Sequence, residues 1–167
     1  MSSLDRVDLI EMLGQSALFT GLGREELGLV LDIIRTKRFG AGDIVFREGE
    51  VGEALFLVKE GRVAITKQVK GNVEQVLAHL GPCDYFGEMA VMDKIPRTAT
   101  ATAEEDCVLV VVGESDLVKM MDDYPKAAAK IMFNLLRTFS KRLRATNEQI
   151  RDAVKWGLEA TGYQVEV

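Results

Sequence analysis

The stretch FGEMAVMDKIPRTAT, residues 86–100, combines a glycine and a glutamate at one end with a proline and an arginine near the other. Gly87 allows the backbone to approach a ligand closely, and a short helical turn beginning at Glu88 would direct N–H groups at an anion. Arg97 follows a proline at the start of a β-type run, and its planar fork suits the two exocyclic oxygens of a phosphodiester. The stretch therefore predicts a receptor for a small anion.

Glu88 supplies an acceptor beside that anion. A carboxylate next to a phosphate needs a donor, and a ribose 2′-hydroxyl provides one while distinguishing ribose from deoxyribose. Thr98 can add a hydroxyl donor, and Ala90 and Ala99 leave room for a ligand. Taken singly, each residue has an ordinary structural explanation, such as a surface charge or a half-buried strand. Only their combination favours a ligand with a phosphate and a neighbouring hydroxyl.

Short β-type runs surround this stretch. They cover residues 43–46, 55–59, 62–68, 74–80, 98–103 and 107–112. Several short strands at this spacing favour an antiparallel sandwich or barrel. The gaps between the runs hold glycines, for which a positive φ costs little and which we interpret as turn residues, at positions 40, 42, 49, 52, 61, 71 and 81.

Helical patterns flank the β-rich segment. Leu9, Ile10 and Leu13 form one stripe, and a second helix is predicted over residues 24–35. Another helix starts at Glu114, is interrupted near Pro125 and continues to about residue 162. The predicted division is an N-terminal helical segment (1–35), a β-barrel with the anion-binding stretch 86–100 (36–113), and C-terminal helices serving as lid or dimer contact (114–167).

The last helix carries apolar or small residues at steps of four and three. They form a heptad seam of more than three repeats, made of Met132, Leu136, Phe139, Leu143, Thr146, Ile150, Ala153 and Gly157. One interpretation is a face that packs on the chain's own barrel. Ile131 and Leu135 already supply a separate stripe for that contact. A parallel dimer along the seam is therefore favoured.

Composition limits the class of protein. With 167 residues, 47% of them hydrophobic, the chain can fill one core and carry an appendage. The net charge of −5 opposes nucleic acid as the main partner, and the basic excess after residue 125 is interpreted as a solvated helix face instead of a DNA-binding arm. We expect a cytoplasmic protein, because neither a membrane span nor a secretory signal is visible.

The sequence lacks the parts of an enzyme. His79 is the single histidine and has no catalytic partner, and Gly21-Leu22-Gly23 is not followed by the lysine of a phosphate loop. Hydrolysis of a cyclic phosphate would need a metal cluster or a nucleophile, and neither is visible. Cys83 and Cys107 lack metal-ligand spacing and are expected to be free thiols. We predict no catalytic residue, no metal and no cofactor.

The stretch 86–100 also resembles the phosphate-binding cassette of the cyclic-nucleotide-binding family, FGE-x-A followed by PR-x-AT, without gaps. Further family landmarks are Leu18-Phe19, the turn 40–43, REGE at 47–50 with Gly52, and GRV at 61–63. The resemblance implies a mainly β fold, an antiparallel β-roll or jelly-roll barrel (double-stranded β-helix) with N-terminal helices and a long C-terminal helix.

The resemblance also assigns roles. Glu88 would bind the ribose hydroxyl and Arg97 the cyclic phosphate, with main-chain groups near Gly87, Ala90 and Thr98 assisting. Apolar walls around base and sugar would come from Ile65, Leu77, Leu80 and Met89. The candidate ligand-binding residues in and around the cassette are thus Ile65, Leu77, Leu80, Phe86, Gly87, Glu88, Met89, Ala90, Pro96, Arg97, Thr98 and Ala99.

The segment KRLRATNE, residues 141–148, is similar to the dimer helix of the bacterial catabolite activators of the Crp/Fnr type. In those proteins a Thr-Ser pair reads adenine; here Thr146 matches, whereas Asn147 departs from serine. The similarity adds Arg142, Thr146 and Asn147 to the candidate site and implies a homodimer. Those activators continue into a helix-turn-helix domain, whereas this sequence ends at Val167 and contains no DNA reader.

The predicted function is a regulatory sensor that binds cAMP or cGMP and signals through its C-terminal helix. Thr98 occupies a position where several cGMP-binding relatives have threonine, whereas Thr146 favours adenine, so cAMP is placed first. Two alternatives remain open: a barrel of the same fold that binds a cyclic dinucleotide, and a dimerisation module without ligand. The joint presence of Glu88 and Arg97 disfavours the second, because such residues have little reason to sit there unpaired.

Overall fold

The chain forms two compact units, Met1–Ile131 and Met132–Val167. The structure, a computed structural model, describes residues 3–71 and 73–161. The last helix ends at Ala160, and residue 162, near which we predicted its end, lies outside the described residues. Within the described part of the chain, no helix combines the length and the apolar character needed to cross a bilayer.

Helices begin and end the first unit. Leu9 and Leu13 of α1 are buried, as the predicted stripe requires, and Gly23 donates its N–H to the Glu26 carboxylate at 2.7 Å at the start of α2. Pro125 separates the last two helices, as predicted. The helical elements of the described residues are α1 (Ser3–Gln15), the 3₁₀ turn η1 (Ala17–Phe19), α2 (Arg24–Ile33), the short α3 (Glu88–Asp93) between β6 and β7, α4 (Glu114–Asp123) and α5 (Pro125–Ala160).

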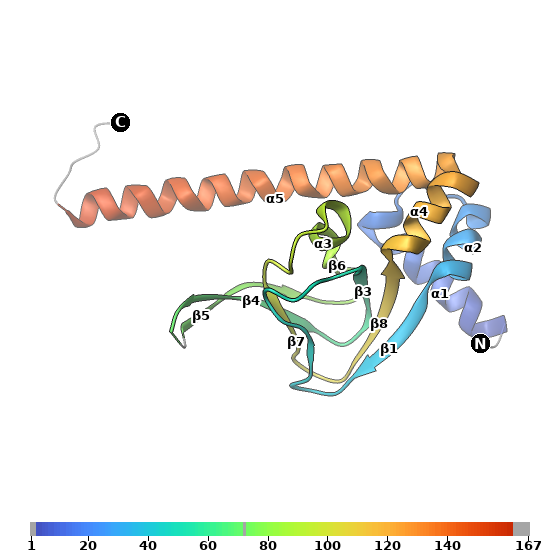
Figure 1. Cartoon of the computed structure of the whole chain (residues 1–167), viewed down its shortest axis with the longest axis horizontal. Helices are drawn as coiled ribbons and strands as arrows, with labels where there is room; N and C mark the ends of the chain where they lie inside the picture. Colours follow the sequence, from blue (N-terminus) through green and yellow to red (C-terminus); the bar gives the residue numbers. More distant parts are fainter. Residues whose placement is uncertain (1–2, 72, 162–167) are drawn as a thin grey trace. The chain divides into compact units, whose positions relative to one another are not determined.

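Two four-stranded antiparallel sheets form the barrel. The first has the order β1-β8-β3-β6 and the second β2-β7-β4-β5, and α1, α2 and α4 gather near the end of β8 (Figure 1). The predicted antiparallel roll is confirmed. The strands are β1 (Arg35–Phe39), β2 (Ile44–Phe46), β3 (Ala54–Glu60), β4 (Val63–Lys70), β5 (Val73–Leu80), β6 (Tyr85–Phe86), β7 (Thr100–Ala103) and β8 (Cys107–Gly113).

The core lies between the sheets. Three phenylalanines meet there, with ring centroids 5.7 Å apart for Phe46 and Phe56, 5.8 Å for Phe46 and Phe86, and 5.4 Å for Phe56 and Phe86. Phe56 and Phe86 are buried together with aliphatic residues of β4, β7 and β8. This aromatic contact places the start of the cassette, at Phe86, directly on the core.

Two strands depart from the predictions. The second helix was predicted to reach Arg35, but α2 ends at Ile33 and residues 35–39 form β1, paired with β8 from Arg35↔Val111 to Phe39↔Cys107. This strand is mostly exposed, so it has no alternating apolar pattern. The two-residue strand β6 was not predicted either. The division of the sequence at residues 35 and 113 stays a prediction.

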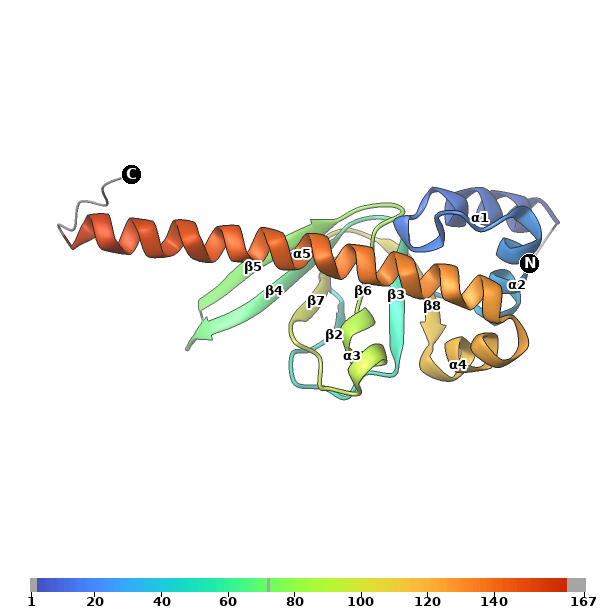
Figure 2. The same ribbon diagram turned by 90° about the horizontal axis from the view of Figure 1, so that it is seen from above.

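The β4–β5 hairpin, at one edge of the second sheet, extends beyond the other strands (Figure 2). Its base is buried at Val63 and Ala64, whereas residues 67–70 and 73–77 are exposed wherever the structure describes them. Val69 and Val73 are both 62% exposed. The end of the hairpin therefore has no buried face of its own.

Candidate functional site

The cassette begins where β6 leaves the core. Gly87 has φ of 79°, in the left-handed region, and is followed at once by the short helix α3 (Glu88–Asp93). The predicted helical turn at Glu88 is thereby confirmed. A Cβ on Gly87 would lie 2.7 Å from Nη1 of Arg97. The glycine is thus required both by its backbone angle and by the arginine beside it.

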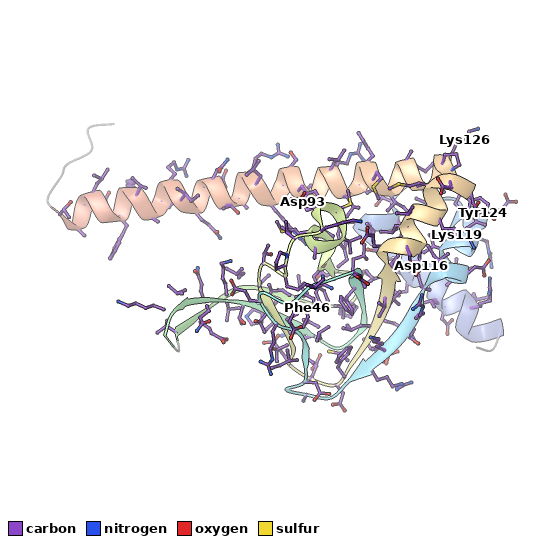
Figure 3. All side chains as sticks on the ribbon, viewed as in Figure 1. Phe46, Asp93, Asp116, Lys119, Tyr124 and Lys126 are labelled. Carbon is purple, nitrogen blue, oxygen red and sulfur yellow. The ribbon has the colours of Figure 1, made fainter. Side chains whose placement is uncertain are left out.

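Arg97 lies inside the molecule with 6% of its surface exposed. Its Nη1 donates to the carbonyl oxygen of Gly87 and its Nη2 to that of Ala54, both at 2.7 Å. Its Cζ lies 4.1 Å from the centroid of the Phe46 ring, and Figure 3 shows Phe46 among the side chains that fill the barrel. The guanidinium is therefore fixed in position without any ligand.

Main-chain hydrogen bonds hold residue 97 as well. Its N–H donates to the carbonyl of Glu50 at 2.8 Å, and its carbonyl accepts from the N–H of Gly49 at 2.9 Å. The loop 47–53 and the end of the cassette are thus joined at the arginine. Lys67 of β4 adds a third connection, since its Nζ donates to the carbonyl of Thr98 at 2.8 Å and pairs with Glu48 at 3.2 Å.

The charge of Arg97 is incompletely compensated. Burial lowers the pKa of its guanidinium below the usual range, while the carboxylates of Glu50 and Glu88 act in the opposite direction. The buried Nε of Arg97 has no hydrogen-bond partner. A buried cation with a free donor favours an anionic ligand.

Glu88 is the first residue of α3 and is 2% exposed. A carboxylate at the start of a helix is favoured by the N–H groups of the first turn. Glu88 is also close enough to Arg97 to raise the pKa of the guanidinium. A ligand with a phosphate beside a hydroxyl needs a cation and an acceptor at such close range.

The other predicted cassette residues differ in exposure. Phe86, Ala90 and Ala99 are buried, whereas Met89, Pro96 and Thr98 are exposed. The Thr98 hydroxyl lies 3.7 Å from the Met89 sulfur. Buried and exposed positions alternate from Pro96 to Ala99, so the hydroxyl of Thr98 stays accessible.

The predicted apolar wall is only partly assembled. Ile65 and Leu80 pack against the core cluster that contains Phe86, so these three residues are brought together. Leu77 is 49% exposed and Met89 is 43% exposed, and neither belongs to that cluster. The contact of Leu77 and Met89 with a nucleotide stays a prediction.

Arg142, Thr146 and Asn147 lie on α5 in the second unit and are exposed. Their contact with a nucleotide stays a prediction. Along the seam, Leu136, Leu143 and Ile150 are 61%, 62% and 56% exposed, whereas Leu135 on the neighbouring stripe is 1% exposed. The separate roles of the two stripes stay a prediction.

The remaining chemically active side chains are placed apart from the cassette. His79 lies 2.9 Å from both carboxylate oxygens of Glu104 and is exposed. Cys83 and Cys107 are free thiols, and burial raises the pKa of both. Among residues 3–71 and 73–161, no group of three or more histidine, cysteine or acidic residues could hold a metal ion.

Sequence reasoning missed the residues that hold Arg97. Ala54 and Gly87 act through carbonyl oxygens, which every residue has, and therefore leave no signal in the sequence. Phe46 was assigned to a strand and Lys67 to a β-type run, without a role at the site. Gly52 was taken as a turn glycine, but its φ lies outside the left-handed region and a Cβ there would meet Arg97.

Comparison with known proteins agrees with this geometry. The family model described as "Cyclic nucleotide-binding domain" matches residues 36–124. A "Cyclic AMP receptor protein" of Thermus thermophilus is 34% identical over 135 residues, 81% of this chain and 61% of that protein. The chain thus spans less than two thirds of the length of that relative.

Solved structures with the same fold include several with more than 30% identity. The catabolite activator protein of Thermus thermophilus has a TM-score of 0.77 and 32% identity, covering 83% of this chain and 63% of that one. The regulatory domain of Toxoplasma gondii PKA, crystallised with cAMP, has a TM-score of 0.66 and 32% identity, covering 71% and 45%.

These matches identify the class to which the fold and the buried arginine point. The chain belongs to the cyclic nucleotide-binding domain family. It is a regulatory domain homologous to bacterial cAMP receptor proteins and to the regulatory subunits of cAMP-dependent protein kinases.

Proposed function

We propose that this chain binds cAMP in the cassette 86–100 and acts as a sensor, not as an enzyme. The observation that carries the proposal is Arg97, a buried arginine anchored by two carbonyl oxygens, with a buried Nε that lacks a partner. The anchors leave the remaining N–H groups for an anion. A cyclic phosphate supplies the negative charge that this site lacks.

Glu88 supports a ribose as the group next to that phosphate. The buried carboxylate accepts hydrogen bonds, and the 2′-hydroxyl of a ribose donates one. A simple phosphate or a sulfate would match the arginine but offers no hydroxyl group to the carboxylate. The pair of residues is therefore better matched by a cyclic ribonucleotide than by an inorganic anion.

Two relatives support adenine as the base, since one is named for cyclic AMP and another was crystallised with cAMP. The exposed residue Thr98 supports cGMP as a second candidate, because its hydroxyl oxygen could accept a hydrogen bond from a guanine amino group. Thr146 on α5 would contact the base from the helix. In this proposal cAMP binds more tightly than cGMP, and neither is a cofactor.

We further infer that α5 is the output of the sensor and joins two chains. Leu136, Leu143 and Ile150 are more than half exposed and lie on one heptad seam, as a helix pair requires. A second copy of the same seam would bury these side chains in a parallel dimer. The proposed setting is the bacterial cytoplasm, and the downstream partner would be a protein.

Isothermal titration calorimetry with a panel of ligands tests the proposal. The panel contains cAMP, cGMP, 2′-deoxy-cAMP, 5′-AMP and a cyclic dinucleotide. We expect one site per chain, with cAMP the tightest ligand and 5′-AMP much weaker. Tighter binding of the dinucleotide would support the alternative barrel, and no heat with any ligand would support a ligand-free module.

A further inference from the structure

We propose that Gly52 is a positioning residue for Arg97: its missing side chain leaves the slot in which the guanidinium lies flat. The inference rests on the proposed function for its effect on nucleotide binding. Its structural part does not, because the contact between Gly52 and Arg97 lies within the chain itself.

The slot at Gly52 has no room for a Cβ. A Cβ added to Gly52 would lie 2.2 Å from Nε, 2.3 Å from Cζ and 2.7 Å from Nη2 of Arg97. These are its three nearest heavy atoms, so Arg97 is the principal obstacle. The similar distances to Nε and Cζ place the added carbon over the flat face of the guanidinium. Because φ of Gly52 is outside the left-handed region, an alanine could adopt this backbone.

The guanidinium has little freedom to make room. Phe46 lies against it at 4.1 Å, and the carbonyls of Gly87 and Ala54 fix its two terminal nitrogens at 2.7 Å. An alanine at position 52 would therefore push Arg97 away from its anchors. The arginine side chain is flexible enough to move, so the chain would still fold. The guanidinium, however, would no longer be held in one orientation.

A displaced Arg97 guanidinium would bind an anion less well. Hydrogen bonds to a charged group depend steeply on distance and angle, and Arg97 is held in place before the ligand arrives. We expect Gly52→Ala to weaken cAMP binding by about 10- to 100-fold, the range expected for losing one hydrogen bond to a charged group. The matched control is Gly81→Ala, because a Cβ on Gly81 meets nothing within 4 Å and its φ is also outside the left-handed region.

The decisive experiment is a double-mutant cycle on the full chain. Gly52→Ala is made in the parent and in Arg97→Ala, and urea unfolding without ligand is measured for all four proteins. We expect Gly52→Ala to lower the unfolding midpoint of the parent and to leave that of Arg97→Ala unchanged or higher, since the obstacle is then absent. An equal loss in both backgrounds would assign Gly52 a backbone role and overturn the proposal.

Hydrogen exchange at the Arg97 side chain adds a measurement that reports on the slot itself and not on the overall stability of the fold. The buried Arg97 Nε–H should exchange slowly in the parent and in Gly81→Ala, and faster in Gly52→Ala, as followed by ¹⁵N NMR. Parent-like exchange and parent-like cAMP affinity in Gly52→Ala would also overturn the proposal. If the parent binds no cyclic nucleotide, the proposed function fails, whereas the unfolding cycle and the exchange rates still decide whether the slot exists.

Discussion

The cassette and the C-terminal helix differ in how far their key side chains are buried by contacts within one chain. Glu88 and Arg97 are 2% and 6% exposed, and the arginine has two main-chain acceptors. Along α5, by contrast, Leu143 is 62% exposed and Ile150 56%. The charged residues of the cassette are buried within a single chain, whereas the seam of α5 exposes large apolar side chains. Under the proposed function, the first region would bind a small ligand and the second a macromolecule.

The largest effect should come from removing the anion-binding group. Arg97→Ala should abolish cAMP binding at micromolar ligand, because truncating one partner of a buried charge pair costs about 2–5 kcal/mol and about 1.4 kcal/mol is tenfold in affinity. Calorimetry measures the affinity, and circular dichroism checks that the fold is kept. Arg38→Ala, at an exposed arginine of β1, is the control and should bind as the parent does. Parent-like binding by Arg97→Ala would show that the site is assigned to the wrong residue.

A smaller effect should distinguish the ribose from the phosphate. The hydrogen bond between Glu88 and a 2′-hydroxyl should contribute roughly 1.5–3 kcal/mol, because the acceptor is charged. The parent should therefore bind 2′-deoxy-cAMP weakly, and Glu88→Gln should narrow the difference between the two ligands. Competition titrations of both ligands with both proteins measure this. An undiminished preference for the ribose in Glu88→Gln would place the hydroxyl contact at another residue.

The smallest effect should connect the two regions. Saturating cAMP should change the dimer dissociation constant by about 1–3 kcal/mol, the usual range for coupling between sites, as measured by analytical ultracentrifugation. Thr146→Ala should reduce this change more than it reduces cAMP affinity, because a ligand shifts an equilibrium only through contacts that differ between its states.

A charge on the seam tests the dimer itself. Leu143→Glu should dissociate the dimer and leave the fold of one chain intact, since Leu143 is already exposed. Ala145→Glu is the control, because residues two apart on a helix do not share a face. A chain that is monomeric at all concentrations, or a dimer indifferent to cAMP, would contradict the coupling and leave the binding site unaffected.

The sequence predicted those elements whose local signals agree with their final environment. Glycine turns and apolar runs located the strands β2, β3, β4, β5, β7 and β8 of the roll, and Pro125 located the break between α4 and α5. The strand β1 was missed because RTKRF is mostly solvent-exposed, so its pairing with β8 leaves no alternation. A strand recognised mainly through its partner cannot be found from its own residues.

The same limit applies to the site. Glu88 and Arg97 were identified because their spacing with Gly87 and Pro96 is specific. Their surroundings were not, because carbonyl oxygens carry no sequence signature and because Gly52 comes near Arg97 only after β2, β3 and the cassette have met. The chemistry of a site can be read from residue types, whereas the contacts that hold it depend on tertiary packing.

The two main-chain hydrogen bonds between residue 97 and residues 49 and 50 have a consequence for the order of folding. They join segments far apart along the chain, and such long-range contacts form slowly. We therefore expect them to form only after the strands between the two segments have paired. A partly folded barrel would contain Arg97 but not its anchors. A nucleotide bound as proposed would recognise the completed roll and, through mass action, would stabilise that state against every earlier one.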